Sequence, residues 1–207
     1  MNKARTFGWI LGWAIPPAWF KILVEKEYPL DHHTFIDASQ DTLKDLSLKA
    51  PFDFIVGYSL GSLILLNELS HVKSYKARVI LLAPILGFSL EENLGGKIER
   101  TELKYTKRML KQSWMNTVES FYTRSQLFIS AKYLESLNPD TLAWGLSELE
   151  SVVIRHKVPE SWSCFCGTLD SLLDAAILKS KIPQLTVVQH ATHAPELLLK
   201  ALKESLV

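Results

Sequence analysis

The sequence predicts an α/β fold in which helices cover both faces of a mostly parallel sheet and a helical cap is inserted into the chain. Short apolar segments alternate with helical patterns, as expected for β-α-β units, and the segments begin as strands at residues 6–11, 34–37, 52–57 and 77–84. The run Val79-Ile80-Leu81-Leu82 has the continuous apolar character of a parallel strand buried on both faces. From about 89 to 158 the pattern is helical alone, so we expect the cap there.

The remaining elements follow from local patterns in chain order. Residues 18–25 are expected to form the first helix, and leucines at helical spacing predict another over 60–72. Two amphipathic segments, 101–111 and 114–122, lie in the cap. After the cap we expect a strand at 162–167, a helix at 175–180, a last strand at 184–189 and a helix at 195–206.

Size and charge limit the possible functions. The chain has 207 residues, of which 47% are hydrophobic, so residues 1–207 can form a single domain around one core. A formal net charge of +1 argues against general binding to nucleic acid or membranes. The apolar stretch 6–15 is similar to a short signal peptide, but Pro16-Pro17 ends it and no cleavage pattern follows. We therefore expect a cytoplasmic monomer that binds neither nucleic acid nor membrane.

The two cysteines do not predict a disulfide or a metal site. Cys164 and Cys166 are one residue apart in an expected strand, so both would point to the same face and could not bridge each other. We expect reduced core residues, with no metal and no cofactor.

A nucleophile motif follows the strand at 52–57. Gly57-Tyr58-Ser59-Leu60-Gly61 is a G-x-S-x-G sequence between an apolar strand and a helix, the order required for a serine on a sharp strand-to-helix turn. Both glycines are needed because a side chain at either position would collide with neighbouring backbone. The hypothesis is therefore a serine hydrolase with Ser59 as nucleophile.

A serine nucleophile needs a histidine base and a carboxylate, which follow in that fold in the order Ser, acid, His. Asp170 comes after the strand at 162–167, and His193 comes after the last strand, so both lie at the same sheet edge as Ser59. His190 and Asp174 are rivals; we interpret His190 as a loop residue that holds the turn and Asp174 as a helix cap.

An acyl-transfer site also requires hydrogen-bond donors for the oxyanion. The backbone amides of Leu60, directly after the nucleophile, and of a residue in Gly12-Trp13-Ala14, after the first strand, are the candidates.

With these motifs in place, the chain resembles the α/β-hydrolases, and among them the pimeloyl-[acyl-carrier protein] methyl ester esterases of biotin synthesis, of the BioH type and its shorter analogues. The matching segments span nearly the whole chain: Leu11-Gly12-Trp13 with Trp19, the G-x-S-x-G motif, Gly167-Thr168-Leu169-Asp170, Asn116 to Phe121 in the cap, and His193-Ala194-Pro195.

The resemblance implies Ser59 as nucleophile, Asp170 as orienting acid, His193 as general base, and the amides of Trp13 and Leu60 as oxyanion donors. Three positions depart from the family pattern. Leu11 replaces a frequent histidine, Ala14 a frequent glycine, and Tyr58 a frequent tryptophan.

A basic segment in the cap suggests a partner. Six basic residues against two acidic ones give residues 97–111 a net charge of +4, and five of them are spaced to share one helix face: Arg100, Lys104, Lys107, Arg108 and Lys111. An acidic acyl-carrier protein bearing the substrate would be attracted there. The alternative is an ordinary solvated helix face.

The function expected is hydrolysis of the methyl ester of a carrier-bound pimeloyl chain through an acyl-enzyme. A thioesterase or short-chain carboxylesterase with the same triad is the alternative. A catalytically silent binding protein would lack a triad member, and all three are present in the sequence.

Overall fold

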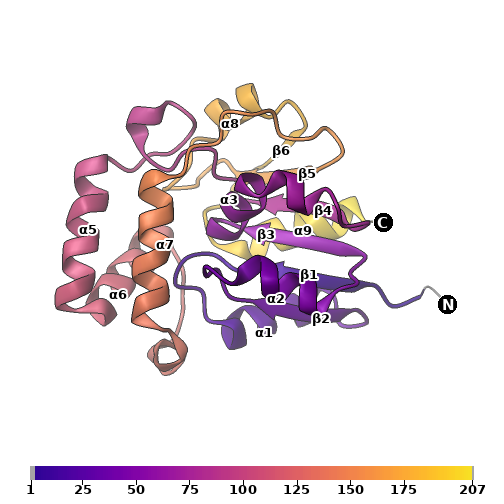
Figure 1. The fold of residues 1–207 in the computed structure, drawn as a ribbon, viewed down its shortest axis with the longest axis horizontal. Coiled ribbons are helices and arrows are strands. Elements are labelled where there is room, and N and C mark those ends of the chain that lie inside the picture. The colour runs from indigo at the N-terminus through magenta and orange to yellow at the C-terminus, as the bar shows by residue number, and fades with distance from the viewer. Residues whose placement is uncertain (1–2, 207) are drawn as a thin grey trace.

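A computed structural model describes residues 3–206 as a parallel sheet surrounded by helices (Figure 1). The sheet has the strand order β2-β1-β3-β4-β5-β6, and every neighbouring pair is parallel. The strands are β1 (Thr6–Ile10), β2 (His32–Ile36), β3 (Phe54–Tyr58), β4 (Arg78–Leu82), β5 (Ser163–Gly167) and β6 (Leu185–Val188). The expected parallel α/β sheet is confirmed.

Helices connect the strands along the chain. They are α1 (Pro17–Glu27), α2 (Thr42–Lys49), α3 (Leu60–Asn67), α4 (Leu69–Val72), α5 (Arg100–Gln112), α6 (Trp114–Ser125), α7 (Pro139–Ser151), α8 (Ala175–Lys181) and α9 (Pro195–Ser205), with short 3-10 helices η1 (Leu90–Glu92) and η2 (Ala131–Ser136).

Neighbouring residues of β3 show that helices cover both faces of the sheet. The Tyr58 ring stacks on Phe20 of α1, with ring centroids 5.6 Å apart. A side chain at Gly57 would contact Leu65 of α3. Because successive strand residues point to opposite faces, α1 and α3 lie on opposite sides of the sheet. Helix α9 packs against α1 and therefore belongs to the same layer.

Between β4 and β5 the chain leaves the sheet and forms a separate group of helices. Figure 1 shows α5, α6 and α7 at one side of the molecule, away from both termini. Helix α5 packs against both α6 and α7. An ion pair between Lys107 and Glu150, 2.6 Å long, joins α5 to α7. We call the helices α5, α6 and α7 the cap.

The sequence prediction was wrong in two places on the sheet side. Helix α2 was not expected, because its sequence is largely polar and only Thr42 and Leu46 are fully buried. The helix expected over 60–72 is interrupted at Glu68, whose backbone ψ of 31° ends α3 before α4 begins.

Candidate active site

Ser59 occupies a strained turn between β3 and α3. Its backbone φ of 53° and ψ of −114° are unfavourable for a residue with a side chain. The flanking glycines make the turn possible: a Cβ at Gly57 would lie 2.8 Å from the Gly61 carbonyl oxygen, and one at Gly61 would overlap the Ile10 carbonyl oxygen. The steric requirement expected for both glycines is confirmed.

Asp170 lies in the loop after β5 and is fully buried. One carboxylate oxygen, Oδ1, accepts hydrogen bonds from the backbone amides of Leu172 and Leu173, at 2.8 and 3.0 Å. The backbone carbonyl of Asp170 in turn accepts a 2.6 Å hydrogen bond from the Lys97 ammonium group. These contacts fix the carboxylate and leave Oδ2 free to face another partner.

His193 lies in the loop before α9 and joins the other two side chains. Its Nδ1 is 2.8 Å from Asp170 Oδ2, and its Nε2 is 3.0 Å from Ser59 Oγ. Because a carboxylate only accepts, Nδ1 carries the proton, and Nε2 is then free to accept from the serine hydroxyl. The structure thus brings Ser59, His193 and Asp170 into one buried hydrogen-bonded chain.

The two rival residues have other places. His190 is exposed, and its backbone φ of 61° is that of a tight turn, in which its amide donates to Thr168 Oγ1 at 2.9 Å. Asp174 accepts from the amides of Ala176 and Ile177, both at 2.9 Å, and so caps α8. Both interpretations made from the sequence are confirmed.

The loop after β1 lies directly against Ser59. A Cβ at Gly12 would be 3.2 Å from the Ser59 Cβ. Among the described residues, none accepts a hydrogen bond from the backbone N–H of Trp13 or of Leu60, so both donors are available to a ligand. Ala14, the residue that replaces a frequent glycine, has a φ of 57°, and its carbonyl accepts a 2.6 Å hydrogen bond from Tyr122 of α6.

Tyr58 makes a contact with the His193 loop that the sequence did not reveal. Its buried hydroxyl donates a 2.7 Å hydrogen bond to the His193 carbonyl oxygen. Burial, with a further contribution from the Asp170 charge, raises the pKa of Tyr58 well above its usual value, so the phenol stays a donor. The only signal in the sequence was the position of Tyr58 directly before the nucleophile.

The basic row on α5 is less uniform than its sequence implied. Arg100 pairs with Glu92, and Lys107 pairs with Glu150. Hydrogen bonding to Lys107 lowers the pKa of Glu150, and Lys104 and Arg100 add to this effect. Lys104, Arg108 and Lys111 are exposed. Two of the five expected contact residues are thus occupied by internal ion pairs, which the spacing along one helix could not show.

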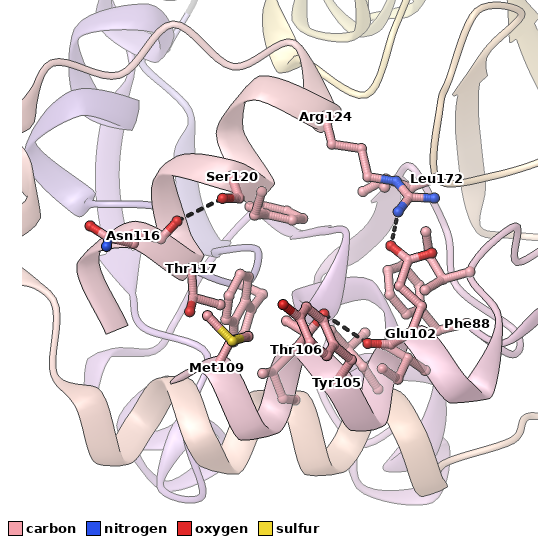
Figure 2. Close-up of a pocket in the computed structure, with 16 residues that line it drawn as sticks. Phe88, Glu102, Tyr105, Thr106, Met109, Asn116, Thr117, Ser120, Arg124 and Leu172 are labelled. Carbon is pink, nitrogen blue, oxygen red and sulfur yellow. Dashed lines mark hydrogen bonds and ion pairs between the residues drawn. The ribbon is translucent and has the colours of Figure 1, made fainter. Parts of the chain in front are cut away.

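A cavity of about 380 Å³ lies inside the cap, between α5 and α6 (Figure 2). Its wall is mostly apolar and includes Phe88, Leu103, Met109, Phe121 and Leu149. Arg124 and Glu102 form an ion pair at its edge, as Figure 2 shows. The cavity has the size and lining of a site for a small apolar ligand.

The cysteines and the other potential ligand atoms of residues 3–206 form no metal site. Cys164 and Cys166 are both buried and unpaired, and burial raises the pKa of Cys164 to about 12. Within residues 3–206, no cluster of three or more histidine, cysteine or acidic side chains is arranged to hold a metal ion. In the same residues, no helix has the length and apolar character needed to cross a bilayer.

Comparison with protein-family models and with curated proteins gives no match. Solved structures do match over the whole chain. An esterase from Exiguobacterium antarcticum superimposes with a TM-score of 0.74 at 12% identity, covering 100% of this chain and 91% of that protein. An epoxide hydrolase from Bacillus megaterium gives 0.68 at 11%, covering 99% and 93%. BioG from Haemophilus influenzae gives 0.56 at 15%, covering 91% and 88%.

These similarities establish the α/β-hydrolase fold for this chain. They do not establish the reaction, because proteins of this fold include both an esterase and an epoxide hydrolase.

Proposed function

We propose that this protein is a serine carboxylesterase in which Ser59, His193 and Asp170 form the catalytic triad. The observation that carries the proposal is the buried hydrogen-bonded chain from Asp170 Oδ2 through His193 to Ser59 Oγ, with links of 2.8 and 3.0 Å. A serine hydroxyl is a weak nucleophile at neutral pH, and a histidine held in this tautomer by a carboxylate is the arrangement that activates it.

In the first half-reaction, Ser59 Oγ attacks the ester carbonyl carbon while His193 Nε2 takes the hydroxyl proton. The carbonyl oxygen becomes an oxyanion, which the free amides of Trp13 and Leu60 stabilise. When the tetrahedral intermediate collapses, the bond between the carbonyl carbon and the alcohol oxygen breaks. His193 gives its proton to the departing alcohol, and the acyl group remains on Ser59.

In the second half-reaction, His193 takes a proton from water and the resulting nucleophile attacks the acyl-enzyme. Collapse of this intermediate breaks the bond to Ser59 Oγ, which regains its proton from His193, and the free acid leaves. Asp170 stays ionised throughout and stabilises the imidazolium that forms in each half-reaction.

The substrate that we propose is the methyl ester of a pimeloyl chain on an acyl-carrier protein. The motif resemblance described above supports this choice, and the apolar cap cavity offers a place for the chain. The exposed cations Lys104, Arg108 and Lys111 on α5 offer contacts for an acidic carrier.

A fluorophosphonate probe, which reacts with activated serines, tests the chemistry independently of the substrate. We expect stoichiometric labelling of the native protein and none of Ser59→Ala. Ser180→Ala, on α8, is the matched control and should label fully. Failure of the native protein to label would contradict an esterase mechanism and favour a binding protein.

Hydrolysis assays then separate the candidate substrates. We expect release of methanol from pimeloyl-carrier methyl ester, and no release with Ser59→Ala. Cleavage of the thioester instead would identify a thioesterase. Equal kcat/KM for the carrier-bound ester and for free short-chain esters would identify a general carboxylesterase.

The carrier contact has its own test. The double variant Lys104→Glu, Arg108→Glu should raise KM for the carrier-bound ester by about tenfold at low salt and leave kcat/KM for a free methyl ester unchanged. Lys73→Glu, Lys76→Glu, outside the cap, is the control. An unchanged KM for the carrier-bound ester would reject α5 as the docking face.

A further inference from the structure

Among the described residues, Trp13 alone lines both the cap cavity and a second, smaller cavity at the loop after β1. The smaller cavity, about 70 Å³, is formed by residues 12–15 together with the start of α7. Neither cavity is lined by Ser59 or His193. Trp13 is 4% exposed, so its indole is a wall between the cap cavity and the loop that faces Ser59.

The indole is held from several sides. Its Nε1 donates a 2.8 Å hydrogen bond to the Leu142 carbonyl oxygen of α7. The ring packs edge-on against Phe121 of α6, with centroids 4.8 Å apart. On α7, Gly145 leaves room for the ring, because a Cβ there would lie 2.7 Å from Trp13 Cδ1. The Trp13 indole is thus fixed in one position between the cap cavity and the loop that faces Ser59.

The cap cavity is open to solvent on one side and is lined by buried residues toward the triad. Tyr105 on its wall is 57% exposed, and the paired side chains of Glu102 and Arg124 are about 40% exposed, so the cavity opens toward solvent along α5 and α6 (Figure 2). Trp13 and Leu172, which also line the cavity, are buried. Leu172 donates its amide to Asp170, so this buried part of the wall lies toward the triad.

We propose that the cap cavity binds a straight apolar acyl chain and that the Trp13 indole determines which acyl chains can reach Ser59. This inference rests on the proposed esterase function. The carbonyl carbon must lie at Ser59, beyond the indole, while the chain runs back through the cavity to its open end. A short acyl group uses only the space next to Ser59. A longer acyl group must pass the fixed indole, so Trp13 limits longer or branched chains most strongly.

Straight-chain p-nitrophenyl esters, from acetyl to decanoyl, provide the test. Each methylene that is buried raises affinity about fourfold. If two or three more methylenes of the acyl chain can enter the cavity, kcat/KM should rise by about 16- to 60-fold. We expect Trp13→Ala to raise the ratio of octanoyl to acetyl kcat/KM at least tenfold, and Trp13→Phe to raise it less. Both variants keep the backbone N–H of residue 13. An unchanged ratio in both would overturn the inference.

A second variant tests the cavity without touching Trp13. Met109→Trp, on the cavity wall, fills part of the space and should lower the ratio of octanoyl to acetyl kcat/KM at least tenfold. Trp144→Phe, on the face of α7 that lines neither cavity, is the matched control. Equal losses for both esters in Met109→Trp would reject the cavity as the chain site.

Failure of this inference and failure of the proposed function give different results. Loss of fluorophosphonate labelling in the native protein rejects the esterase itself. Full labelling with normal acetyl ester hydrolysis, combined with an unchanged chain-length profile in the Trp13 and Met109 variants, rejects only the role of Trp13 and the cavity.

Discussion

The hydroxyl of Tyr58 and the backbone carbonyl of His193 are joined by a 2.7 Å hydrogen bond, and both residues are buried. The residue before Ser59 thereby holds the loop that carries His193. A contact between these two parts of the chain couples the position of Ser59 to that of His193.

Tyr58→Phe should therefore lower both activity and stability. Removing the phenol leaves the buried His193 carbonyl without its donor, which costs about 1–3 kcal/mol in the free energy of unfolding. We expect kcat/KM to fall about three- to tenfold as His193 loses its fixed position. Urea unfolding and ester hydrolysis measure the two effects. Tyr75→Phe, whose hydroxyl makes an exposed contact with Ser47, is the control; a native kcat/KM in Tyr58→Phe would show that the bond does not position the base.

Asp170→Asn tests the carboxylate while preserving its local structure. An asparagine oxygen can still accept from the Leu172 and Leu173 amides, so stability should change little. The amide group would face His193 Nδ1 as a donor and favour the wrong tautomer, which costs about 10⁴-fold in kcat in a comparable triad. Asp174→Asn keeps a good helix cap and should retain activity. A loss below tenfold in Asp170→Asn would argue against its catalytic role.

Gly145→Ala should disturb the site although alanine is the better helix former. The new Cβ would lie 2.7 Å from Trp13 Cδ1 and 2.9 Å from Leu60 Cδ2, so α7 must shift away from both residues. Alanine gains about 1 kcal/mol in helix propensity, and we expect the steric conflict to exceed that gain, giving a lower melting temperature and lower kcat. Ser147→Ala on the same helix is the control. An increase in stability with native kcat would show that α7 adapts freely.

Ala14→Gly should increase stability. Ala14 has a φ of 57°, and a left-handed conformation costs a residue with a side chain about 1–2 kcal/mol. Glycine avoids this cost but loses more chain entropy on folding, so the expected gain is about 0.5–1 kcal/mol in the free energy of unfolding. Chemical denaturation measures it, and Ala143→Gly within α7 should show the opposite sign. Destabilisation by Ala14→Gly would mean that packing of the Ala14 methyl group stabilises the fold by more than the left-handed backbone conformation of Ala14 costs.

The ion pair between Arg5 and Asp31 should make the free energy of unfolding depend on pH in the acidic range. Burial alone raises the pKa of Asp31, but hydrogen bonds from the Arg5 side chain and amide, at 2.8–3.2 Å, outweigh it and lower the pKa. When the pKa of a carboxyl group is lower in the folded than in the unfolded protein, its ionisation stabilises the fold. This stabilisation is fully present above the pKa in the unfolded chain, about 4. It is lost as the pH falls through the pKa in the folded protein. Asp31→Asn should therefore be less stable than the native protein at pH 7, with a difference that shrinks by pH 2.5. A difference independent of pH would reject this account.

Local patterns predicted the sheet and placed Ser59, Asp170 and His193 at one edge of it. Each of these inferences uses a signal within about ten residues: apolar strands, the G-x-S-x-G turn and the loops after strands. The roles of Tyr58 and Gly145 depend on contacts with His193 and Trp13, more than 130 residues away. Likewise, the partners of Arg100 and Lys107 lie on other elements, so a charge count along one helix overestimated the free positive charge.

The position of the cap in the chain has a consequence for how the site is assembled. Ser59 precedes the cap, and Asp170 and His193 follow it. A chain cut in the loop between α6 and η2 would carry Ser59 on one fragment and Asp170 and His193 on the other. Ester hydrolysis by the two mixed fragments would report that they have associated. Their association must restore the parallel pairing between β4 and β5, because β4 lies on one fragment and β5 on the other. The insertion of the cap between Ser59 and the other two side chains thus divides the proposed esterase into two fragments whose association can be assayed.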